Sequence, residues 1–155
     1  MSTVSENTNE VLNDLVRINN DRIEGYIKAE KESEDKTPEL ISTFQQMVKQ
    51  SQDCESALTQ LIIKGGGTVA EGTTLSGKIY RTWQDVRIAF SANEKKNILS
   101  YCEFGEDAAQ KAYKSALEES DLTDEARILI SNQKDELRRS HDLIKRYRDQ
   151  QAVEA

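Results

Sequence analysis

Hydrophobic residues recur at steps of three and four along most of this chain, which is the spacing of one face of an α-helix. Four long segments carry such a stripe, at about residues 8–32, 38–64, 91–119 and 124–150. Amphipathic helices must bury their stripes against one another to be stable. The pattern therefore predicts an all-α protein built as a four-helix bundle.

Local signals mark where these helices should begin and end. Pro38 suits a first helical position, where its missing N–H group costs nothing. The run Gly65–Gly67 should end the second helix, because glycine tolerates the left-handed conformation that often follows a helix. Ser, Thr and Asn side chains can accept hydrogen bonds from free N–H groups at a helix start. The expected caps are Asn7, Thr37, Ser91 and Thr123.

Each helix should turn one stripe toward the bundle axis. The first stripe is Leu12, Leu15, Asn19, Ile23, Tyr26 and Glu30; the second is Leu40, Phe44, Met47, Ser51, Cys54, Leu58 and Leu61. The third is Ile98, Cys102, Glu106, Ala109, Tyr113 and Ala116; the fourth is Ala126, Ile130, Gln133, Leu137, His141, Ile144 and Tyr147. Polar residues interrupt every stripe, so a polar layer is expected inside the bundle.

The lengths of the connections predict the topology. Short links at residues 33–36 and 120–122 should join antiparallel helix pairs. The long link between them has a stripe of its own, Ile79, Trp83, Val86 and Phe90, which predicts a short fifth helix. A ferritin-like bundle with this helix in a long crossover is the favoured arrangement, and a plain up-down bundle is the alternative. Residues 1–155 should form one domain, ordered over about 8–150.

Composition excludes several classes of function. The net charge is −7, and an acidic chain repels the phosphate backbone of nucleic acids. No apolar run approaches the roughly 20 residues of a membrane span, and the first residues do not read as a secretion signal. Two cysteines, Cys54 and Cys102, make no disulfide framework. We therefore expect a cytoplasmic protein that binds neither nucleic acid nor membrane.

The candidate metal-binding residues are polar side chains on or beside the stripes. Carboxylates and a histidine facing a bundle axis could hold a metal ion, because a buried charge must be paired or bound to a metal. The candidate ligands are Glu106, His141, Glu103, Glu55, Glu24 and Glu30. A di-metal carboxylate site also uses Glu-x-x-His on two helices, and the chain has no such sequence. Its only histidine, His141, follows Arg138 at that spacing.

A hydrogen-bonded polar layer is therefore the favoured interpretation, with Glu106 bonded to neutral groups such as Gln133 or Tyr113. Replacing Glu106 by Gln should then be mild. The alternative is a metal held by Glu106, His141 and another carboxylate.

With one histidine, no catalytic arrangement of nucleophile and base is visible. A P-loop-like run, Gly72–Ile79, lacks the final Ser or Thr that would reach magnesium, so a nucleotide site is disfavoured.

Several segments along nearly the whole chain carry a resemblance. They are Leu12–Leu15, Asn20–Tyr26, Gly77–Trp83, Cys102–Asp107 with Tyr113, and His141–Asp142 with Arg146–Asp149. Together they resemble an uncharacterised bacterial family of ferritin-like four-helix-bundle proteins. The resemblance implies a ferritin-like fold and a bacterial, cytoplasmic protein, but no activity, since the family's function is unassigned. Related ferritin-like groups are associated with stress responses.

Two hypotheses follow from the sequence. The first is a non-catalytic helical bundle without cofactor, which acts through interactions, is stress-associated, and could form a homo-oligomer. The second is a metal-carboxylate protein that uses iron or manganese for oxidase or storage chemistry. The missing Glu-x-x-His favours the first hypothesis.

Overall fold

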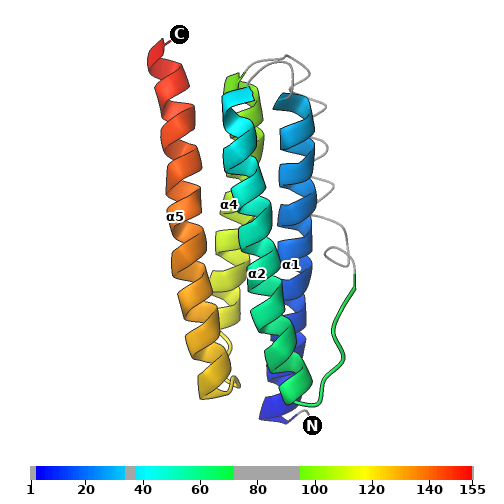
Figure 1. Ribbon diagram of the computed structural model, residues 1–155. Coiled ribbons are helices and arrows are strands. Elements are labelled where there is room, and N and C mark those ends of the chain that lie inside the picture. Colours follow the sequence, from blue (N-terminus) through cyan, green and yellow to red (C-terminus); the bar gives the residue numbers. More distant parts are fainter. Residues whose placement is uncertain (1–2, 34–37, 72–94, 155) are drawn as a thin grey trace.

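The computed structural model describes residues 3–33, 38–71 and 95–154, and these residues form four long helices (Figure 1). The helices are α1 (Val4–Ser33), α2 (Ile41–Lys64), α4 (Lys95–Leu117) and α5 (Asp124–Glu154), with one short 3-10 helix, η1 (Pro38–Leu40). No strand occurs in these ranges. The all-helical prediction is confirmed for the described part of the chain.

Helix α1 begins four residues earlier than the sequence predicted. Thr3, rather than Asn7, caps it: the backbone N–H of Glu6 donates to Thr3 Oγ1 at 3.0 Å. Asn7 lies inside the helix and donates its side-chain amide to Asp121 Oδ2 at 3.2 Å. The prediction that Asn7 caps this helix is therefore wrong, because a threonine four residues earlier supplies the same kind of acceptor.

The glycine run ends α2 as predicted. Gly66 has φ +80°, the left-handed conformation, and its N–H donates to Ile63 O at 3.0 Å. The N–H of Gly67 donates to Ile62 O at 2.9 Å. These two bonds are the paired contacts of a Schellman motif, which satisfies carbonyls that the end of a helix leaves free.

The start of α5 was predicted correctly, and the helix extends past its predicted end. The N–H of Ala126 donates to Thr123 Oγ1 at 3.2 Å, so Thr123 is the expected cap. The helix continues to Glu154, beyond Gln150, where fraying was expected. The other two predicted caps, Thr37 and Ser91, lie outside the described residues.

The helices form two antiparallel pairs, α1 with α2 and α4 with α5, and α1 packs against α4 between them (Figure 1). Helices α2 and α4 run in the same direction, so α2 ends at the opposite end of the bundle from the start of α4. This arrangement excludes a plain up-down bundle.

Asn13 of α1 holds the start of the long connection, bonding Thr68 O at 2.9 Å and the N–H of Ala70 at 2.7 Å. The predicted fifth helix, with Trp83, and the P-loop-like run at 72–79 lie outside the described residues.

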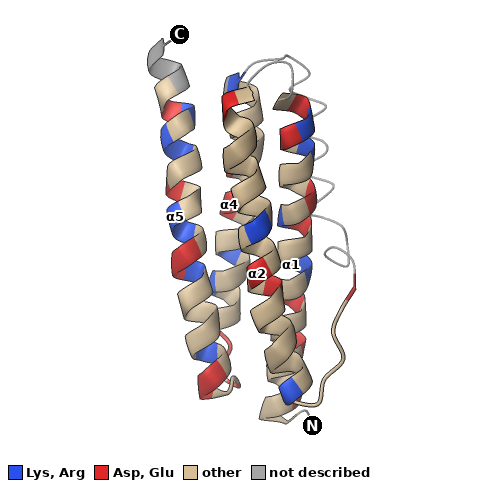
Figure 2. Ribbon diagram, viewed as in Figure 1, with Lys and Arg blue, Asp and Glu red and all other residues tan. Residues whose placement is uncertain are grey.

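Two apolar clusters fill the bundle, one toward each end. One contains Leu12, Leu15, Leu58, Ile130 and Leu137, and the other contains Tyr26, Phe44, Leu99, Cys102 and Ile144. Acidic and basic residues alternate along the helices, most visibly along α5 (Figure 2). Among the described helices, none combines the length and apolar character that crossing a membrane requires. Between the two clusters lies a set of buried polar residues.

Candidate functional site

A buried ion pair joins α1 to α4 in the middle of the bundle. The side chains of Arg22 and Glu106 are each 1% exposed, and Arg22 Nε donates to Glu106 Oε1 at 2.5 Å. Each charge would be very costly to bury alone, and an opposite charge with good hydrogen-bond geometry offsets much of that cost. The pair therefore depends on both of its members.

The other guanidinium nitrogens of Arg22 reach α2. Nη1 donates to Ser51 Oγ at 2.7 Å and to the Met47 carbonyl oxygen at 3.4 Å. Nη2 lies 3.6 Å from Met47 Sδ, and the guanidinium carbon lies 5.2 Å from the ring centroid of Tyr26. Arg22 thus links three helices through hydrogen bonds and makes a cation–π contact within α1.

The pair sets the electrostatics of its surroundings. Burial disfavours the charge on Arg22, but Glu106, together with Tyr26 and Cys54, outweighs this effect and raises the pKa of Arg22 above its ordinary value. Burial and then the negative charge of Glu106 raise the pKa of the Tyr26 phenol and of the Cys102 thiol. Burial also raises the pKa of the Cys54 thiol to about 12. Both cysteines are free, and such thiols are unreactive at neutral pH.

A chain of neutral side chains forms the rest of this layer. Asn19 Nδ2 donates to Tyr113 Oη at 2.9 Å, and Tyr113 Oη donates to Gln133 Oε1 at 2.7 Å. Gln133 Nε2 then donates to the carbonyl oxygen of Cys54 at 3.1 Å. The chain runs from α1 through α4 and α5 to α2, so it ties together all four described helices.

We call the two parts together the central polar layer; it comprises Asn19, Arg22, Ser51, Glu106, Tyr113 and Gln133. The sequence predicted a polar layer here, but it assigned Glu106 the wrong partner. Tyr113 and Gln133 bond each other, and Glu106 pairs with Arg22. A carboxylate in this position is already neutralised by a fixed cation of the same chain.

A family sequence model covers every residue of this layer except Gln133. The sequence model of a domain of unknown function, DUF2383, matches residues 7–119. The chain belongs to this family. The DUF2383 match includes both Arg22 and Glu106, whereas helix α5 lies beyond it. No curated protein and no solved structure matches the chain.

The structure brings together two of the predicted metal ligands, away from the central polar layer. Glu103 of α4 and His141 of α5 lie close to each other and to Asp107 of α4, with one ligand atom from each residue within 4.8 Å of the others. His141 Nε2 lies 2.5 Å from Asp107 Oδ1. His141 is 19% exposed and Asp107 is 53% exposed, so this cluster faces outward.

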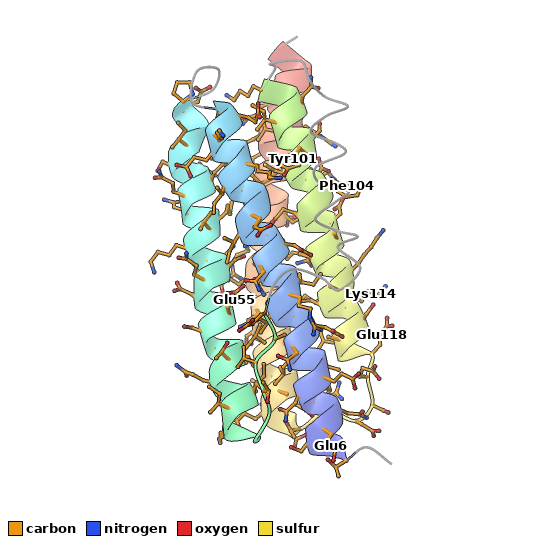
Figure 3. The ribbon with its side chains drawn as sticks, turned by 90° about the vertical axis from the view of Figure 1, so that its right-hand side faces the viewer. Glu6, Glu55, Tyr101, Phe104, Lys114 and Glu118 are labelled. Carbon is orange, nitrogen blue, oxygen red and sulfur yellow. The ribbon has the colours of Figure 1, made fainter. Side chains whose placement is uncertain are left out.

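The remaining candidates lie apart from this cluster. Glu55 of α2 lies in the middle third of the bundle (Figure 3), and burial raises its pKa to about 7. Glu30 accepts a hydrogen bond from Gln45 Nε2 at 2.8 Å, and Glu24 is exposed. Glu106, Glu55, Glu30 and Glu24 therefore do not join His141 in one site within the described residues.

The main residue that the sequence reading missed is Arg22. The expected stripe placed Ile23 on the axis, but Ile23 is half-buried and Arg22 is fully buried. Strict alternation of three- and four-residue steps leads from Leu15 through Asn19 to Arg22 and Tyr26. This spacing was a signal for Arg22 in the sequence. The preference for a hydrophobic residue at that step selected Ile23 instead.

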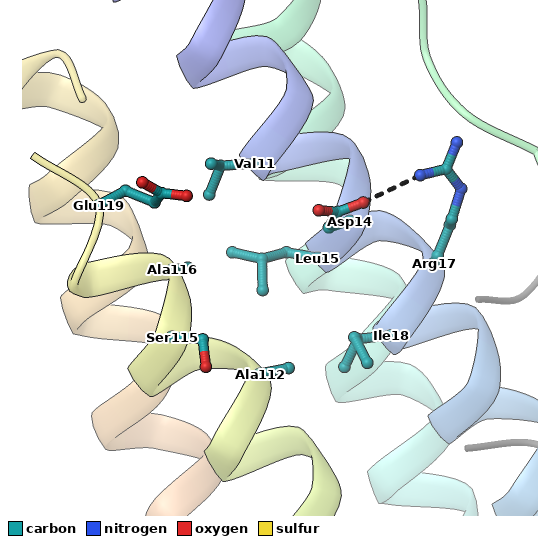
Figure 4. Close-up of a pocket in the computed structure, with 9 residues that line it drawn as sticks. All are labelled: Val11, Asp14, Leu15, Arg17, Ile18, Ala112, Ser115, Ala116 and Glu119. Carbon is teal, nitrogen blue, oxygen red and sulfur yellow. Dashed lines mark hydrogen bonds and ion pairs between the residues drawn. The ribbon is translucent and has the colours of Figure 1, made fainter. Parts of the chain in front are cut away.

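A hollow lies between α1 and α4. It measures about 260 Å³ and has an apolar floor that includes Leu15, Ile18, Ala112 and Ala116 (Figure 4). Asp14, paired with Arg17 at 3.0 Å, and Glu119 border it. Among the described residues its lining contains no histidine, so Ser115 has no imidazole base beside it.

Proposed function

We propose that this DUF2383 protein is a ferritin-like helical bundle that acts through interactions rather than through chemistry at a central metal. The observation that carries the proposal is the buried pair of Arg22 and Glu106. A metal site in a four-helix bundle is built from inward-facing carboxylates at this position. Here Glu106, which is 1% exposed, is paired with the guanidinium of Arg22.

The ligand inventory supports the same proposal. A di-metal carboxylate site needs six side chains around the axis, including two histidines. The chain has one histidine, His141, and it contacts Asp107 and Asp142 at the side of the bundle. Arg22 also repels a divalent cation that would approach Glu106. Iron or manganese chemistry at this centre is the alternative hypothesis.

Metal analysis tests the proposal. The untagged protein is purified without chelator, and iron and manganese are measured per chain in the wild type, in Glu106→Gln, and in the matched control Glu24→Gln. We expect iron and manganese well below one per chain in all three proteins. Stoichiometric iron or manganese in the wild type and in Glu24→Gln, but not in Glu106→Gln, would overturn the proposal.

We also propose that the protein forms a homo-oligomer. Light scattering should show an oligomer, and a monomeric wild type would contradict this.

We also propose that the protein is bacterial and cytoplasmic and that it is associated with stress. These proposals rest on the proposed ferritin-like relationship. The two free and buried cysteines, Cys54 and Cys102, support a reducing compartment. Fractionation of a native host would test the location.

A further inference from the structure

A second group of titratable side chains lies at the interface of α4 and α5, outside the central polar layer. Glu103 and Asp107 are four residues apart on α4, so they share one face of that helix. His141 of α5 lies opposite them. The ligand atoms of the three residues lie within 4.8 Å of one another.

The geometry points to a zinc site formed by Glu103, Asp107 and His141. Zinc takes imidazole nitrogen and carboxylate oxygen as ligands, usually four in a tetrahedron, at about 2.0–2.2 Å. Three protein ligands leave one position for water or for another ligand. Calcium and magnesium prefer oxygen ligands alone, so the imidazole favours a transition metal.

A supporting contact strengthens this assignment. The Nε2 atom of His141 faces Asp107, and its Nδ1 atom lies 3.1 Å from Asp142 Oδ1. Metal-binding histidines almost always donate their second ring N–H to a carboxylate or carbonyl, which fixes the ring and its tautomer. Asp142 is therefore a positioning residue, placed as such a supporting group would be.

The site needs only small adjustments to accept the ion. Glu103 is 12% exposed and is held near His141, whereas Asp107 is 53% exposed and can move. The ion would replace the direct contact of 2.5 Å between His141 Nε2 and Asp107 Oδ1. It would also compete with Arg148, whose Nη1 lies 2.6 Å from Glu103 Oε2.

This inference goes beyond the proposed function and is independent of it. A central metal would depend on Glu106, whereas this one depends on His141 and Asp107. Cations on the other side of His141, among them Lys134 and Arg138, weaken the attraction for a divalent ion. We therefore expect reversible binding rather than the permanent retention of a closed structural site.

Calorimetric titration of untagged, chelator-stripped protein with zinc chloride tests the site. The wild type should bind one zinc per chain. His141→Ala and Asp107→Asn should weaken binding by more than about 10–100-fold, the loss that even a supporting group causes, and Asp142→Asn should weaken it within that range. Asp135→Asn, which alters an exposed carboxylate of the same helix, should bind as the wild type does. Circular dichroism should show all variants folded.

A merely structural role for this cluster predicts a different result. If it only fastens α4 to α5, the variants should lose stability without any zinc effect, and the wild type should show no saturable binding. Either that result, or wild-type zinc affinity in folded His141→Ala, would overturn the proposed zinc site.

Arg148→Gln should bind zinc more tightly, because Glu103 loses its competing cation. Unchanged affinity in that variant would contradict Glu103 as a ligand.

Discussion

Arg22 Nε donates a hydrogen bond of 2.5 Å to Glu106 Oε1 between α1 and α4, and neither side chain is more than 1% exposed. This contact replaces the neutral hydrogen bonding that the sequence suggested for Glu106. It also changes the expected effect of a substitution at this position. An ionised carboxylate whose only partners are neutral groups can be replaced by an amide at little cost, whereas half of a buried ion pair cannot.

The Glu106→Gln substitution should therefore strongly destabilise the protein. It leaves the buried Arg22 charge without its counter-ion, which costs about 3–5 kcal/mol. Urea denaturation followed by circular dichroism measures the loss. Glu118→Gln makes the same chemical change at an exposed position just after the end of α4 and should alter stability by less than about 0.5 kcal/mol. Equal, small effects of both substitutions would show that Glu106 does not need its charge.

Tyr113→Phe tests the neutral half of the central polar layer. Removing the hydroxyl deprives Gln133 Oε1 of the donor it uses at 2.7 Å, and Asn19 loses an acceptor. Leaving a buried polar group unsatisfied costs about 1–3 kcal/mol. Tyr147→Phe, at a half-buried position of α5, is the control and should be milder. The same stability loss in both variants would argue against a continuous hydrogen-bonded chain.

The sequence predicted the architecture better than the contacts inside it. The stripes place Phe44, Leu58, Cys102 and Ile130 in the core, and all four are buried. Helix periodicity depends only on local spacing, so it can be read from one segment at a time. The choice of partner for Glu106 depends on how α1 is rotated and where it meets α4. No single segment contains that information, and a shift of one residue, from Arg22 to Ile23, was enough to hide it.

The candidate metal ligands show the same limit. Glu103 and His141 were each selected from their own segment of the sequence. Their closeness depends on how α4 and α5 are aligned along the bundle axis, and neither segment alone contains that information. Asp107 was not selected; it lies off the predicted stripe, and the structure shows its side chain 53% exposed. The other candidates, such as Glu24 and Glu30, are surface carboxylates of a kind that an amphipathic helix presents in large numbers.

Glu55 should give the stability of the protein a specific dependence on pH. Burial raises its pKa in the folded protein from 4.5 to about 7, so the folded state binds more protons between these values than the unfolded state does. The contribution of Glu55 to the free energy of unfolding therefore falls as pH rises from 4.5 to 7, and is constant above that. Glu55→Gln should be more stable than the wild type above pH 7, with the difference vanishing toward pH 4.5.

Denaturation of both proteins at several pH values measures this difference. Glu24→Gln, an exposed carboxylate of α1, serves as the control and should follow the wild-type curve. A Glu55→Gln curve that stays parallel to the wild type from pH 4.5 to 8 would contradict a desolvated Glu55.

Gly66 should be required for its backbone conformation alone. Its φ is +80°, and a Cβ atom added there would meet no atom within 4 Å. Gly66→Ala should therefore cost about 1–2 kcal/mol through left-handed strain, while Gly66→Asn should cost less, because asparagine enters this region more readily. Thermal denaturation compares the two. An alanine variant as stable as the wild type would show that α2 can end without this motif.

The central claim is that Arg22 and Glu106 act as one buried unit, and a double-mutant cycle tests it most directly. The free energy of unfolding is measured for the wild type, Arg22→Met, Glu106→Leu and the protein that carries both substitutions. We predict that each single variant loses about 3–5 kcal/mol, while the double variant, which has no unpaired buried charge, is within about 1–2 kcal/mol of the wild type or more stable. Losses that simply add in the double variant would contradict the claim.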